Sequence, residues 1–490
     1  MSLLRLGNLS RMKVLFVASE CVPFVKTGGL ADVVGALPGA LAALGVEVRV
    51  LLPAYPAVKA ALPKRAKTVV MGQLPGGRAK LLAAKAKGFD VLALDAPALF
   101  DRPGNPYLGP DGKDWPDNPE RYAALCHLGA EIAAGLLEGW RPDLVHCHDW
   151  QAGLLPYYLK RRDIRVPSVL TVHNIAFQGL TPMDRAGALG IDVADLEAEG
   201  VEYWGNISAL KAGLVFADRL TTVSPTYAEE LMTPEFGMGL DGVLRARRAD
   251  LSGILNGIDL EVWSPEVDAH IQPYKTPRGK AANRKALREE FGLPEAHGPL
   301  CVVVSRMTEQ KGLDLLLEAL PALLARGGQL ALLGSGDPAL EAAYRAIDDP
   351  NVSVRLGYDE TLSHRMIAGG DAILVPSRFE PCGLTQLYGL RYGTLPVVAR
   401  TGGLADTVID ANVAALNAGV ATGIQFAPPD QHALADAVRR TLELYRQPEV
   451  WKKMQRRGMK SDVSWQTSAA RYADIYANLL GLKDYDDQNG

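Results

Sequence analysis

Short runs of apolar residues alternate with longer amphipathic stretches along almost the whole chain. The runs are rich in Val, Ile and Leu, which is typical of parallel strands buried on both faces. In the first half they predict strands at residues 14–19, 47–52, 91–94, 144–147, 168–172, 219–223 and 252–255. In the second half they predict strands at residues 301–305, 329–333, 352–356, 372–375 and 395–399. The alternation with helical stretches predicts an α/β fold of βαβ units in doubly wound parallel sheets.

A proline-rich segment separates the two series of strands. Residues 263–299 hold five prolines among many charged residues, and we interpret them as a linker that leads into a short charged helix. A chain of 490 residues is also too long for one ordinary hydrophobic core. We therefore expect one domain over residues 1–260, a second over 261–463, and a last helical stretch over 464–490 that packs back on one of the two halves.

Composition and charge narrow the class of protein. The chain is 48% apolar and 22% charged, as globular proteins are, and its net charge of −4 comes without a long basic run. These values argue against nucleic acid or anionic lipid as the main partner. Five cysteines without paired spacing fit a reducing compartment, and no apolar stretch is long enough to span a bilayer. Residues 1–11 make a poor signal peptide, so we expect a cytoplasmic protein that begins with a loose extension.

The hexapeptide Thr-Gly-Gly-Leu-Ala-Asp occurs at residues 27–32 and again at residues 401–406. Each copy follows a predicted strand and opens a helical stretch, an arrangement whose backbone N–H groups can face an anion. Lys26 precedes the first copy, whereas Arg400 precedes the second. The copies follow non-equivalent strands, so we do not expect two symmetric anion sites. We expect instead two glycine turns, one from each half, that face one ligand across a cleft.

Polar residues follow several predicted strands, where open parallel sheets bind their ligands. Lys26 could hold a pyrophosphate or a sugar, or it could be a solvated lysine in a tight turn. His146 and His148 share one face of a strand and could begin a metal site, but no further cluster at ligand spacing accompanies them. A polar strand end is favoured instead, with Asp149 near the cleft and capping the next helix. His173 could bind a sugar hydroxyl, transfer a proton or simply anchor its loop.

The second half carries two cations and one carboxylate at similar places. Arg306 and Lys311 flank a predicted strand-to-helix connection, which suits a diphosphate but also fits a solvated loop. Glu380 lies in a loop that enters a helix, where it could bind sugar hydroxyls or stabilise a cationic transition state. Cys382 has no histidine and acid beside it in the sequence, so we expect a packing or contact role rather than a nucleophile.

Six motifs stand in a fixed order along the chain. They are Lys26-Thr-Gly-Gly-Leu-Ala-Asp-Val-Val-Gly, His148-Asp-Trp, Thr171-Val-His-Asn, Ser305-Arg, Gln310-Lys-Gly and Glu380-Pro-Cys-Gly-Leu-Thr-Gln. With these motifs the chain resembles the bacterial glycogen synthases and plant starch synthases over residues 12–480. The resemblance implies two Rossmann-like domains that face each other across a deep cleft, the GT-B arrangement. It also implies a retaining transfer of glucose from ADP-glucose to the 4-hydroxyl at the non-reducing end of an α-1,4-glucan.

The resemblance further implies catalytic roles for five residues. Asp149 and His173 would line the glucose pocket from the first domain. Arg306 and Lys311 would neutralise the diphosphate leaving group from the second domain. Glu380 would hold sugar hydroxyls and favour the oxocarbenium-like state.

Donor-binding positions follow from the same resemblance. Lys26 and the turn at Gly28 and Gly29 would contact the sugar nucleotide from the first domain. Tyr358 would stack on the adenine. The remaining contacts would come from Ser377 and Cys382 and from backbone N–H groups at Gly383, Leu384 and Thr385. Many related retaining enzymes carry Glu-x7-Glu here, but the second position is Tyr388, as in glycogen and starch synthases.

The expected chemistry requires neither a metal nor another cofactor. No carboxylate is obviously placed as a nucleophile, so we hypothesise a front-face mechanism in which the departing diphosphate helps to deprotonate the acceptor. The implied partners are ADP-glucose and an α-1,4-glucan, without nucleic acid or membrane, and the oligomeric state stays open. The alternatives are another GT-B retaining glucosyltransferase that uses UDP-glucose, or a glucan-binding homologue that has lost catalysis. A glucan phosphorylase is less favoured because no pyridoxal-lysine motif is recognisable.

Overall fold

The computed structural model describes residues 12–74 and 77–482, so the extension expected at residues 1–11 lies outside the described residues. The chain divides into two compact units. Unit 1 comprises Met1–Val223, Ala228–Ile254 and Trp465–Gly490, and unit 2 comprises Ser224–Tyr227 and Leu255–Ser464. The main boundary between the units therefore lies between residues 254 and 255, whereas the sequence pattern placed it between residues 260 and 261.

Unit 1 is built around a nine-stranded sheet in the order β12-β11-β7-β6-β1-β2-β5-β4-β3, counted over the described residues. The strands from β12 to β5 run parallel, and β4 and β3 add an antiparallel edge. In sheet order the bounds are β12 Leu251–Gly253, β11 Arg219–Thr222, β7 Ser168–Val172, β6 Leu144–His148, β1 Lys13–Val17, β2 Glu47–Pro53, β5 Phe89–Asp95, β4 Gly77–Ala86 and β3 Lys67–Leu74. A separate small antiparallel sheet holds β8 Leu180–Pro182, β10 Asn206–Ser208 and β9 Glu202–Tyr203.

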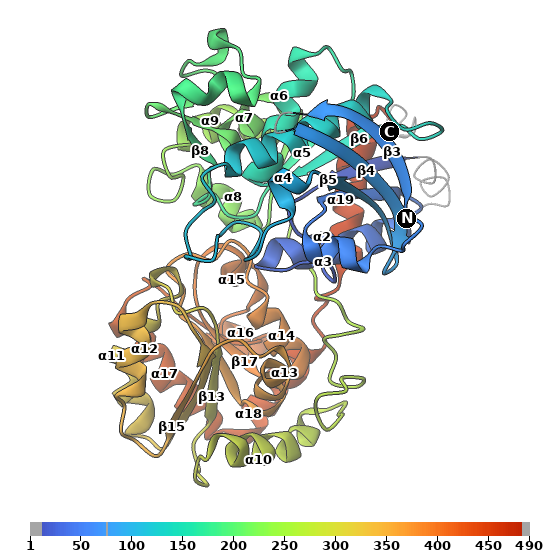
Figure 1. The fold of residues 1–490 in the computed structure, drawn as a ribbon. Helices are drawn as coiled ribbons and strands as arrows, with labels where there is room; N and C mark the ends of the chain where they lie inside the picture. The colour runs from blue at the N-terminus through green and yellow to red at the C-terminus, as the bar shows by residue number, and fades with distance from the viewer. Residues whose placement is uncertain (1–11, 75–76, 483–490) are drawn as a thin grey trace, which may run out of the picture. The chain divides into compact units, whose positions relative to one another are not determined.

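Helices of unit 1 cover the sheet and begin or end at recognisable signals (Figure 1). Ser208 caps α7, because its Oγ accepts the N–H of Lys211 at 3.0 Å. Gly135 ends α5 in the left-handed conformation that favours glycine. The helices are α2 Gly29–Ala42, α3 Pro56–Ala61, α4 Pro97–Phe100, α5 Asn118–Ala134, α6 Leu154–Arg161, α7 Ala209–Phe216, α8 Pro225–Leu231, α9 Asp241–Ala246 and α19 Trp465–Leu479; the first three residues of α8 belong to unit 2.

The last helix of the chain, α19, belongs to unit 1 although it follows unit 2 in sequence. It lies beside α2 from the other end of the chain (Figure 1). Its face toward the unit carries Trp465, Tyr472 and Tyr476, all buried. Burial of aromatic side chains is worth roughly 1.5–3 kcal/mol each, so this face holds the helix in place.

Unit 2 contains a six-stranded parallel sheet in the order β15-β14-β13-β16-β17-β18. In that order the strands are Val352–Leu356, Gln329–Gly334, Leu300–Val304, Ala372–Val375, Leu395–Ala399 and Ile424–Phe426. The helices are α10 Lys280–Phe291, α11 Leu313–Leu324, α12 Pro338–Arg345, α13 Glu360–Gly369, α14 Thr385–Tyr392, α15 Gly402–Thr407, α16 Val413–Ala418, α17 Gln431–Tyr445 and α18 Pro448–Met459. Helices lie on both sides of this sheet (Figure 1), which confirms the doubly wound α/β class.

Alternate residues of one strand enter different cores in unit 2. In β13, Cys301 and Val303 join the cluster that includes α11 and α17, whereas Leu300 and Val302 join the cluster that includes α10, α13 and α14. This is the two-faced burial that the apolar runs predict. The carboxyl ends of the strands are therefore the part of the sheet left for polar side chains.

The proline-rich segment does not behave as a loose linker. Residues 255–279 belong to unit 2, and the charged helix predicted after them is α10. Trp263 is stacked between His364 and Tyr388, with ring centroids 3.7 and 3.8 Å away. Tyr274 donates from its hydroxyl to the carbonyl of Tyr392 at 2.7 Å. These contacts pack the segment against the rest of unit 2, which its proline-rich and charged composition did not predict.

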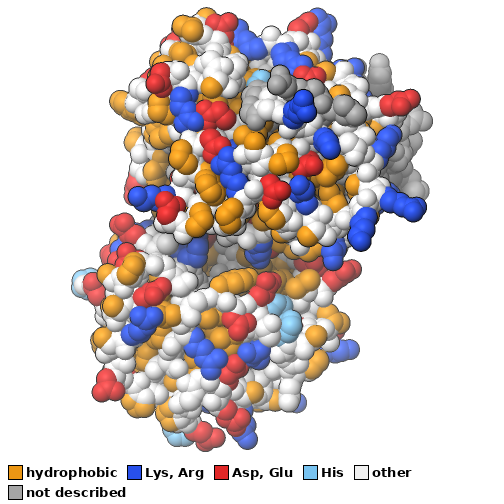
Figure 2. Space-filling model, viewed as in Figure 1, with side chains coloured by type: hydrophobic (Ala, Val, Ile, Leu, Met, Phe, Trp, Pro, Cys, Tyr) orange, Lys and Arg blue, Asp and Glu red, His pale blue; other side chains and the backbone are white. Residues whose placement is uncertain are grey.

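The surface agrees with the charge balance of the sequence. Acidic and basic side chains are interspersed over the face shown in Figure 2, without one continuous basic area. No helix within residues 12–74 or 77–482 is both long and apolar enough to cross a membrane.

Candidate active site

The first glycine turn already holds an anion, and that anion is the carboxylate of Glu20. Thr27 donates its backbone N–H to Glu20 Oε2 and its hydroxyl to Oε1 at 2.6 Å, and Gly28 adds a longer N–H contact of 3.4 Å. The hydroxyl of Tyr107, 87 positions away, also donates to this carboxylate. Part of the anion-binding capacity that the sequence pattern assigned to the turn is therefore used within unit 1.

Lys26 forms an ion pair within its own motif. Its Nζ lies 2.8 Å from Asp32 Oδ1, and both side chains are between a quarter and a third exposed. The backbone N–H groups of Gly29 and Leu30 have no acceptor in the described part of the chain. Added Cβ atoms at Gly28 and Gly29 would meet nothing within 4 Å, so this turn is open on its outer side.

Asp149 follows β6 in a strained conformation, with φ 53° and ψ −167°. The prediction that it caps the next helix is wrong, because its side chain accepts no hydrogen bond from that helix. Oδ1 instead accepts the backbone N–H of His173 at 2.6 Å and that of Asn174 at 3.4 Å, at the end of β7. Burial raises the pKa of Asp149 to about 7, although the two N–H donors act in the opposite direction.

Three buried histidines lie on neighbouring strands: His146 within β6, His148 at the end of β6 and His173 directly after β7. The rings of His146 and His148 lie 4.3 Å apart, which confirms that they share one face of the strand. His148 Nδ1 lies 3.0 Å from His173 Nε2. Burial lowers the pKa of His146 and of His173 to about 3, so both rings are neutral at pH 7. Within the described residues, no group of three or more His, Cys, Asp or Glu side chains is placed to hold a metal ion.

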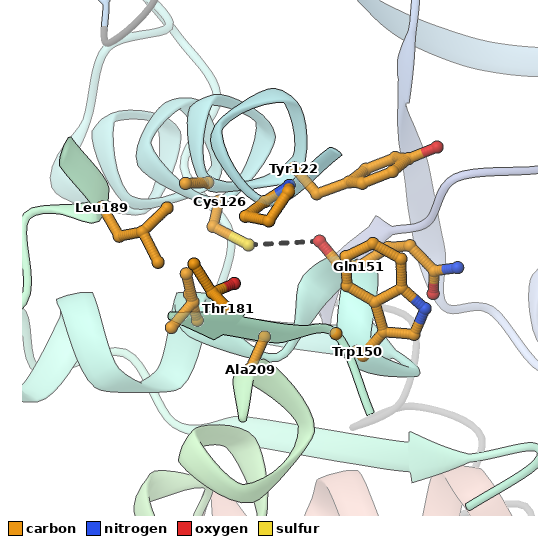
Figure 3. A pocket seen from close by; sticks show the side chains of 11 residues that line it. Tyr122, Cys126, Trp150, Gln151, Thr181, Leu189 and Ala209 are labelled. Atoms are coloured by element: carbon orange, nitrogen blue, oxygen red, sulfur yellow. Dashed lines mark hydrogen bonds between the residues drawn. The ribbon is translucent and has the colours of Figure 1, made fainter. Parts of the chain in front are cut away.

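Trp150, the third residue of the His-Asp-Trp motif, has a packing role. A Cβ on Gly179 would lie 2.3 Å from its ring, so the indole fits only against a glycine. A small pocket beside it has room for about one water molecule (Figure 3). In that pocket the Sγ of Cys126 faces the carbonyl oxygen of Gln151 at 3.3 Å. A pocket of this size is too small for a sugar, so we interpret it as a packing void beside the motif.

In unit 2, Glu380 and Lys311 form a largely buried ion pair. Lys311 Nζ lies 2.6 Å from Glu380 Oε2, with the two side chains 18% and 8% exposed. Ser377 donates from its hydroxyl to the same oxygen at 2.8 Å. Three residues that the sequence placed in one site are thus in direct contact.

Two loops bring this pair together. The loop after β13 and the loop after β16 lie side by side, because the two strands are neighbours in the sheet. Arg378 donates its backbone N–H to the carbonyl of Gln310 at 2.9 Å, and Gln310 returns a side-chain bond to the carbonyl of Phe379. Gly312 has φ 64°, and a Cβ there would lie 2.0 Å from the carbonyl oxygen of Pro376. Only glycine permits this approach, which delivers Lys311 to Glu380.

Arg306 differs from Lys311 in that its side chain has no partner among the described residues. Its side chain is exposed, and no hydrogen bond or ion pair engages it within residues 12–74 and 77–482. The N-terminus of α14 is likewise open, since the backbone N–H groups of Gly383, Leu384 and Thr385 have no acceptor in the described chain. A free guanidinium and a free helix N-terminus are the groups that a diphosphate requires.

The second copy of the hexapeptide supports the Glu380 loop. Gly403 donates its backbone N–H to the carbonyls of Glu380 and Pro381, both at 3.1 Å. A Cβ on Gly402 would lie 2.0 Å from the Glu380 carbonyl oxygen, and one on Gly403 would lie 2.3 Å from that of Cys382. The paired glycines here allow two backbones to touch. The expectation that this copy faces a ligand with its N–H groups is wrong for Gly403.

The three remaining candidates have different surroundings. Cys382 is buried, and burial raises the pKa of its thiol to about 12, in agreement with a packing role. Tyr358 is 73% exposed after β15, and its hydroxyl donates to Glu360 at 2.9 Å. Tyr388 is buried against Trp263. Of the three, only Tyr358 is largely exposed.

Sequence reasoning missed Glu20 and Tyr107, which hold the first glycine turn. Glu20 lies three residues after the end of β1, so its position beyond the carboxyl end of a parallel strand was an available signal. Tyr107 lies in an irregular segment between α4 and α5, where no pattern marks it.

Two models of protein families match the chain, one in each half. The model described as starch synthase catalytic domain matches residues 13–246, and the model described as glycosyl transferases group 1 matches residues 298–444. A glycogen synthase of Paracoccus denitrificans is 62% identical over 470 residues, covering 95% of this chain and 98% of the relative. A glycogen synthase of Roseobacter denitrificans is 58% identical, with 96% and 100% covered.

One solved structure extends the similarity to three dimensions. It is the catalytic domain of starch synthase IV from Arabidopsis thaliana bound to ADP and acarbose. The two chains superpose with a TM-score of 0.85 at 30% identity, over 96% of this chain and 99% of the other. Sucrose-phosphate synthase from Thermosynechococcus elongatus, at 19% identity and a TM-score of 0.60, shares the fold.

Proposed function

The chain belongs to the family of bacterial glycogen synthases and plant starch synthases, and on this basis we propose that it elongates glycogen. It is a glycosyltransferase of GT-B architecture. Its reaction transfers glucose from ADP-glucose to the non-reducing end of an α-1,4-glucan with retention of the anomeric configuration. The observation that carries the proposal is the similarity to glycogen synthases over nearly the whole chain.

The diphosphate of the donor is the group that unit 2 is best equipped to bind. Arg306 offers a planar cation and the N-terminus of α14 offers N–H groups at Gly383 and Leu384, none of them paired within the described residues. Both favour the charge that develops on the diphosphate as the glycosidic bond breaks. Tyr358 provides the exposed ring on which the adenine stacks.

The ion pair between Lys311 and Glu380 places a carboxylate where it can bind the glucosyl group. Its carboxylate has one oxygen, Oε2, occupied by Lys311 and Ser377, so Oε1 is left to accept hydrogen bonds from glucose hydroxyls. The ammonium is held where it adds positive charge beside the leaving group. Neither group then has to reorganise during the reaction, which is the basis of electrostatic catalysis in a preformed site.

Retention follows most simply from attack on the face that the diphosphate leaves. Glu380 is engaged by an ammonium, and the thiol of Cys382 has a pKa near 12, so neither is suited to act as a nucleophile. The departing diphosphate can accept the proton of the acceptor hydroxyl. Asp149 and His173 of unit 1 would line the glucose pocket, the aspartate through the backbone that it holds and the histidine through its ring.

We propose that the reaction requires no metal. In this proposal Arg306, Lys311 and the N-terminus of α14 supply the positive potential that a divalent cation supplies in other transferases.

The choice of donor separates this proposal from its alternatives. Purified protein with glycogen should incorporate labelled glucose from ADP-glucose with a kcat/KM at least about tenfold above that for UDP-glucose. The reverse preference would assign the chain to the UDP-glucose-dependent transferases. Glycogen binding without incorporation from either donor would indicate a homologue that has lost catalysis.

A further inference from the structure

One buried histidine of unit 1 has a neighbour that controls its protonation. His173 Nε2 and His148 Nδ1 are 3.0 Å apart, so one proton lies between them. Burial lowers the pKa of both rings far enough that each is neutral at pH 7. A neutral imidazole carries one proton, on either Nδ1 or Nε2. The shared bond therefore allows two arrangements, which differ in the proton that His173 offers at its other nitrogen.

In the first arrangement, His148 donates from Nδ1 and His173 accepts at Nε2. The remaining proton of His173 is then on Nδ1, and His148 Nε2 is a bare lone pair. In the second arrangement, His173 donates from Nε2 and its Nδ1 becomes an acceptor. His148 must then carry its proton on Nε2.

The surroundings of His148 Nε2 decide between the two. This atom is fully enclosed and has no hydrogen-bond partner in the described part of the chain. The rings of Phe16 and His146 lie 5.1 and 4.3 Å from the His148 ring. His146 cannot act as its partner, because Nδ1 of His146 pairs with the Tyr476 hydroxyl at 2.7 Å and Nε2 with that of Thr171 at 2.6 Å.

An enclosed N–H without an acceptor costs more than an enclosed lone pair without a donor, and it is correspondingly rarer in proteins. The first arrangement leaves only the lone pair. His173 then presents an N–H at Nδ1, which is not fully enclosed and has no partner in the described residues. Asp149 holds the backbone of the same residue and His148 holds Nε2 of its ring, so the side chain is restrained at both ends.

We propose that His148 is a positioning residue that holds His173 as the tautomer with its proton on Nδ1, so that His173 donates a hydrogen bond to a hydroxyl oxygen of the glucosyl group. The inference rests on the proposed function for the identity of the ligand. The tautomer itself follows from the geometry of unit 1 alone. His148 touches no substrate and acts through His173.

The test reads the tautomer directly by nitrogen NMR of protein labelled with 15N-histidine, without substrate, at pH 7.5. The chain has eight histidines, and loss of one signal in His173→Gln assigns the resonance. The wild-type protein should show His173 protonated at Nδ1. Protonation at Nε2 would overturn the inference; the tautomer is read on the wild-type protein, and the variant serves only to assign the resonance.

Two variants of His148 complete the experiment. His148→Asn keeps an amide N–H where Nδ1 stood, and should retain the tautomer and kcat/KM within about threefold. His148→Phe keeps the ring and removes the donor, and should give a tautomer mixture and lose about tenfold or more in kcat/KM. An unchanged tautomer in His148→Phe would overturn the inference. If ADP-glucose is not the donor, the NMR result still decides the tautomer, so the two proposals fail separately.

Discussion

Arg306 and Lys311 carry the same charge at the end of the same strand, but their surroundings differ. Arg306 is exposed and unpaired in the described chain, whereas Lys311 neutralises a carboxylate that is 8% exposed. Truncation of Arg306 should therefore affect only the reaction. Truncation of Lys311 should affect both the reaction and the fold, because it leaves Glu380 buried without its partner.

We predict that Arg306→Ala lowers kcat by about 10²–10³ while the melting temperature stays unchanged. Lys311→Ala should lower kcat by a similar factor and should also lower the unfolding free energy by about 3–5 kcal/mol. Adding Glu380→Gln to this variant should restore part of the lost unfolding free energy, because it removes the buried unpaired charge. Steady-state kinetics and denaturant titration measure both quantities. Arg345→Ala, a 65% exposed arginine on α12, is the matched control and should change neither. Near-normal turnover in Arg306→Ala would sink the assignment of the diphosphate site.

A second residue-scale prediction concerns pH. Burial raises the pKa of Asp149 to about 7 in the folded protein, against a value near 4 when unfolded. The folded state therefore binds more protons between these values, and stability falls as the pH rises through the range. Relative to Asp149→Asn, the wild type should lose unfolding free energy from pH 4 to pH 7 and then level off. Urea titrations at several pH values measure the difference, and parallel curves for the two proteins would contradict the raised pKa.

At the scale of elements, the two copies of one hexapeptide have opposite steric environments. The glycines at 28 and 29 stand open, whereas those at 402 and 403 touch the backbone of the Glu380 loop. The same substitution should therefore destabilise the protein at residue 403 and leave its stability almost unchanged at residue 29. The identical hexapeptide sequences do not reveal this difference, because the steric environment of each turn depends on which other chain segment packs against it.

We predict that Gly403→Ala lowers the unfolding free energy by about 2–4 kcal/mol and reduces kcat, because the added methyl displaces the loop that carries Glu380. Gly29→Ala should leave the unfolding free energy within about 0.5 kcal/mol of the wild type. Gly39→Ala, at an exposed position inside α2 with no atom in reach, should raise it by about 0.5–1 kcal/mol. Thermal denaturation of the three variants measures the order of their stabilities. Equal destabilisation at residues 29 and 403 would refute the different roles of the two copies.

Elements with a clear apolar period were predictable, and those without one were not. Parallel strands such as β13 and β16 are buried on both faces and read as continuous apolar runs. The antiparallel edge of β3 and β4 was missed, because exposed charged residues of β4 such as Lys80 and Lys85 interrupt the continuous apolar run by which the buried strands were found. The short strands β8, β9, β10 and β18 have three residues or fewer, too few for any period.

The candidate site was predictable to the level of residue type but not of pairing. The resemblance to a family named Lys311, Glu380 and Ser377, and the structure shows that they form one ion pair and one hydrogen bond. The anion in the first glycine turn came from Glu20, which no local pattern connects to Thr27. Pairing of this kind depends on loops that meet only after the sheet has formed.

At the scale of the whole molecule, the absence of a metal requirement can be tested on the intact protein. Protein treated with EDTA and then freed of it should turn over at the untreated rate, because protein cations supply the charge stabilisation. Mg²⁺ or Mn²⁺ should add less than about twofold. Loss of activity after chelation that Mg²⁺ or Mn²⁺ restores would contradict this proposal.

Glycogen synthase of Paracoccus denitrificans is similar to this chain over 95% of its length, and the reaction that we propose couples release of ADP to elongation of the glucan. The decisive measurement is the release of ADP from ADP-glucose by purified protein, with and without glycogen. We predict rapid ADP release that depends on glycogen, with one ADP released for each glucose unit added to the glycogen by an α-1,4 linkage. ADP release at the same rate without glycogen, or glycogen binding with no ADP release, would contradict it.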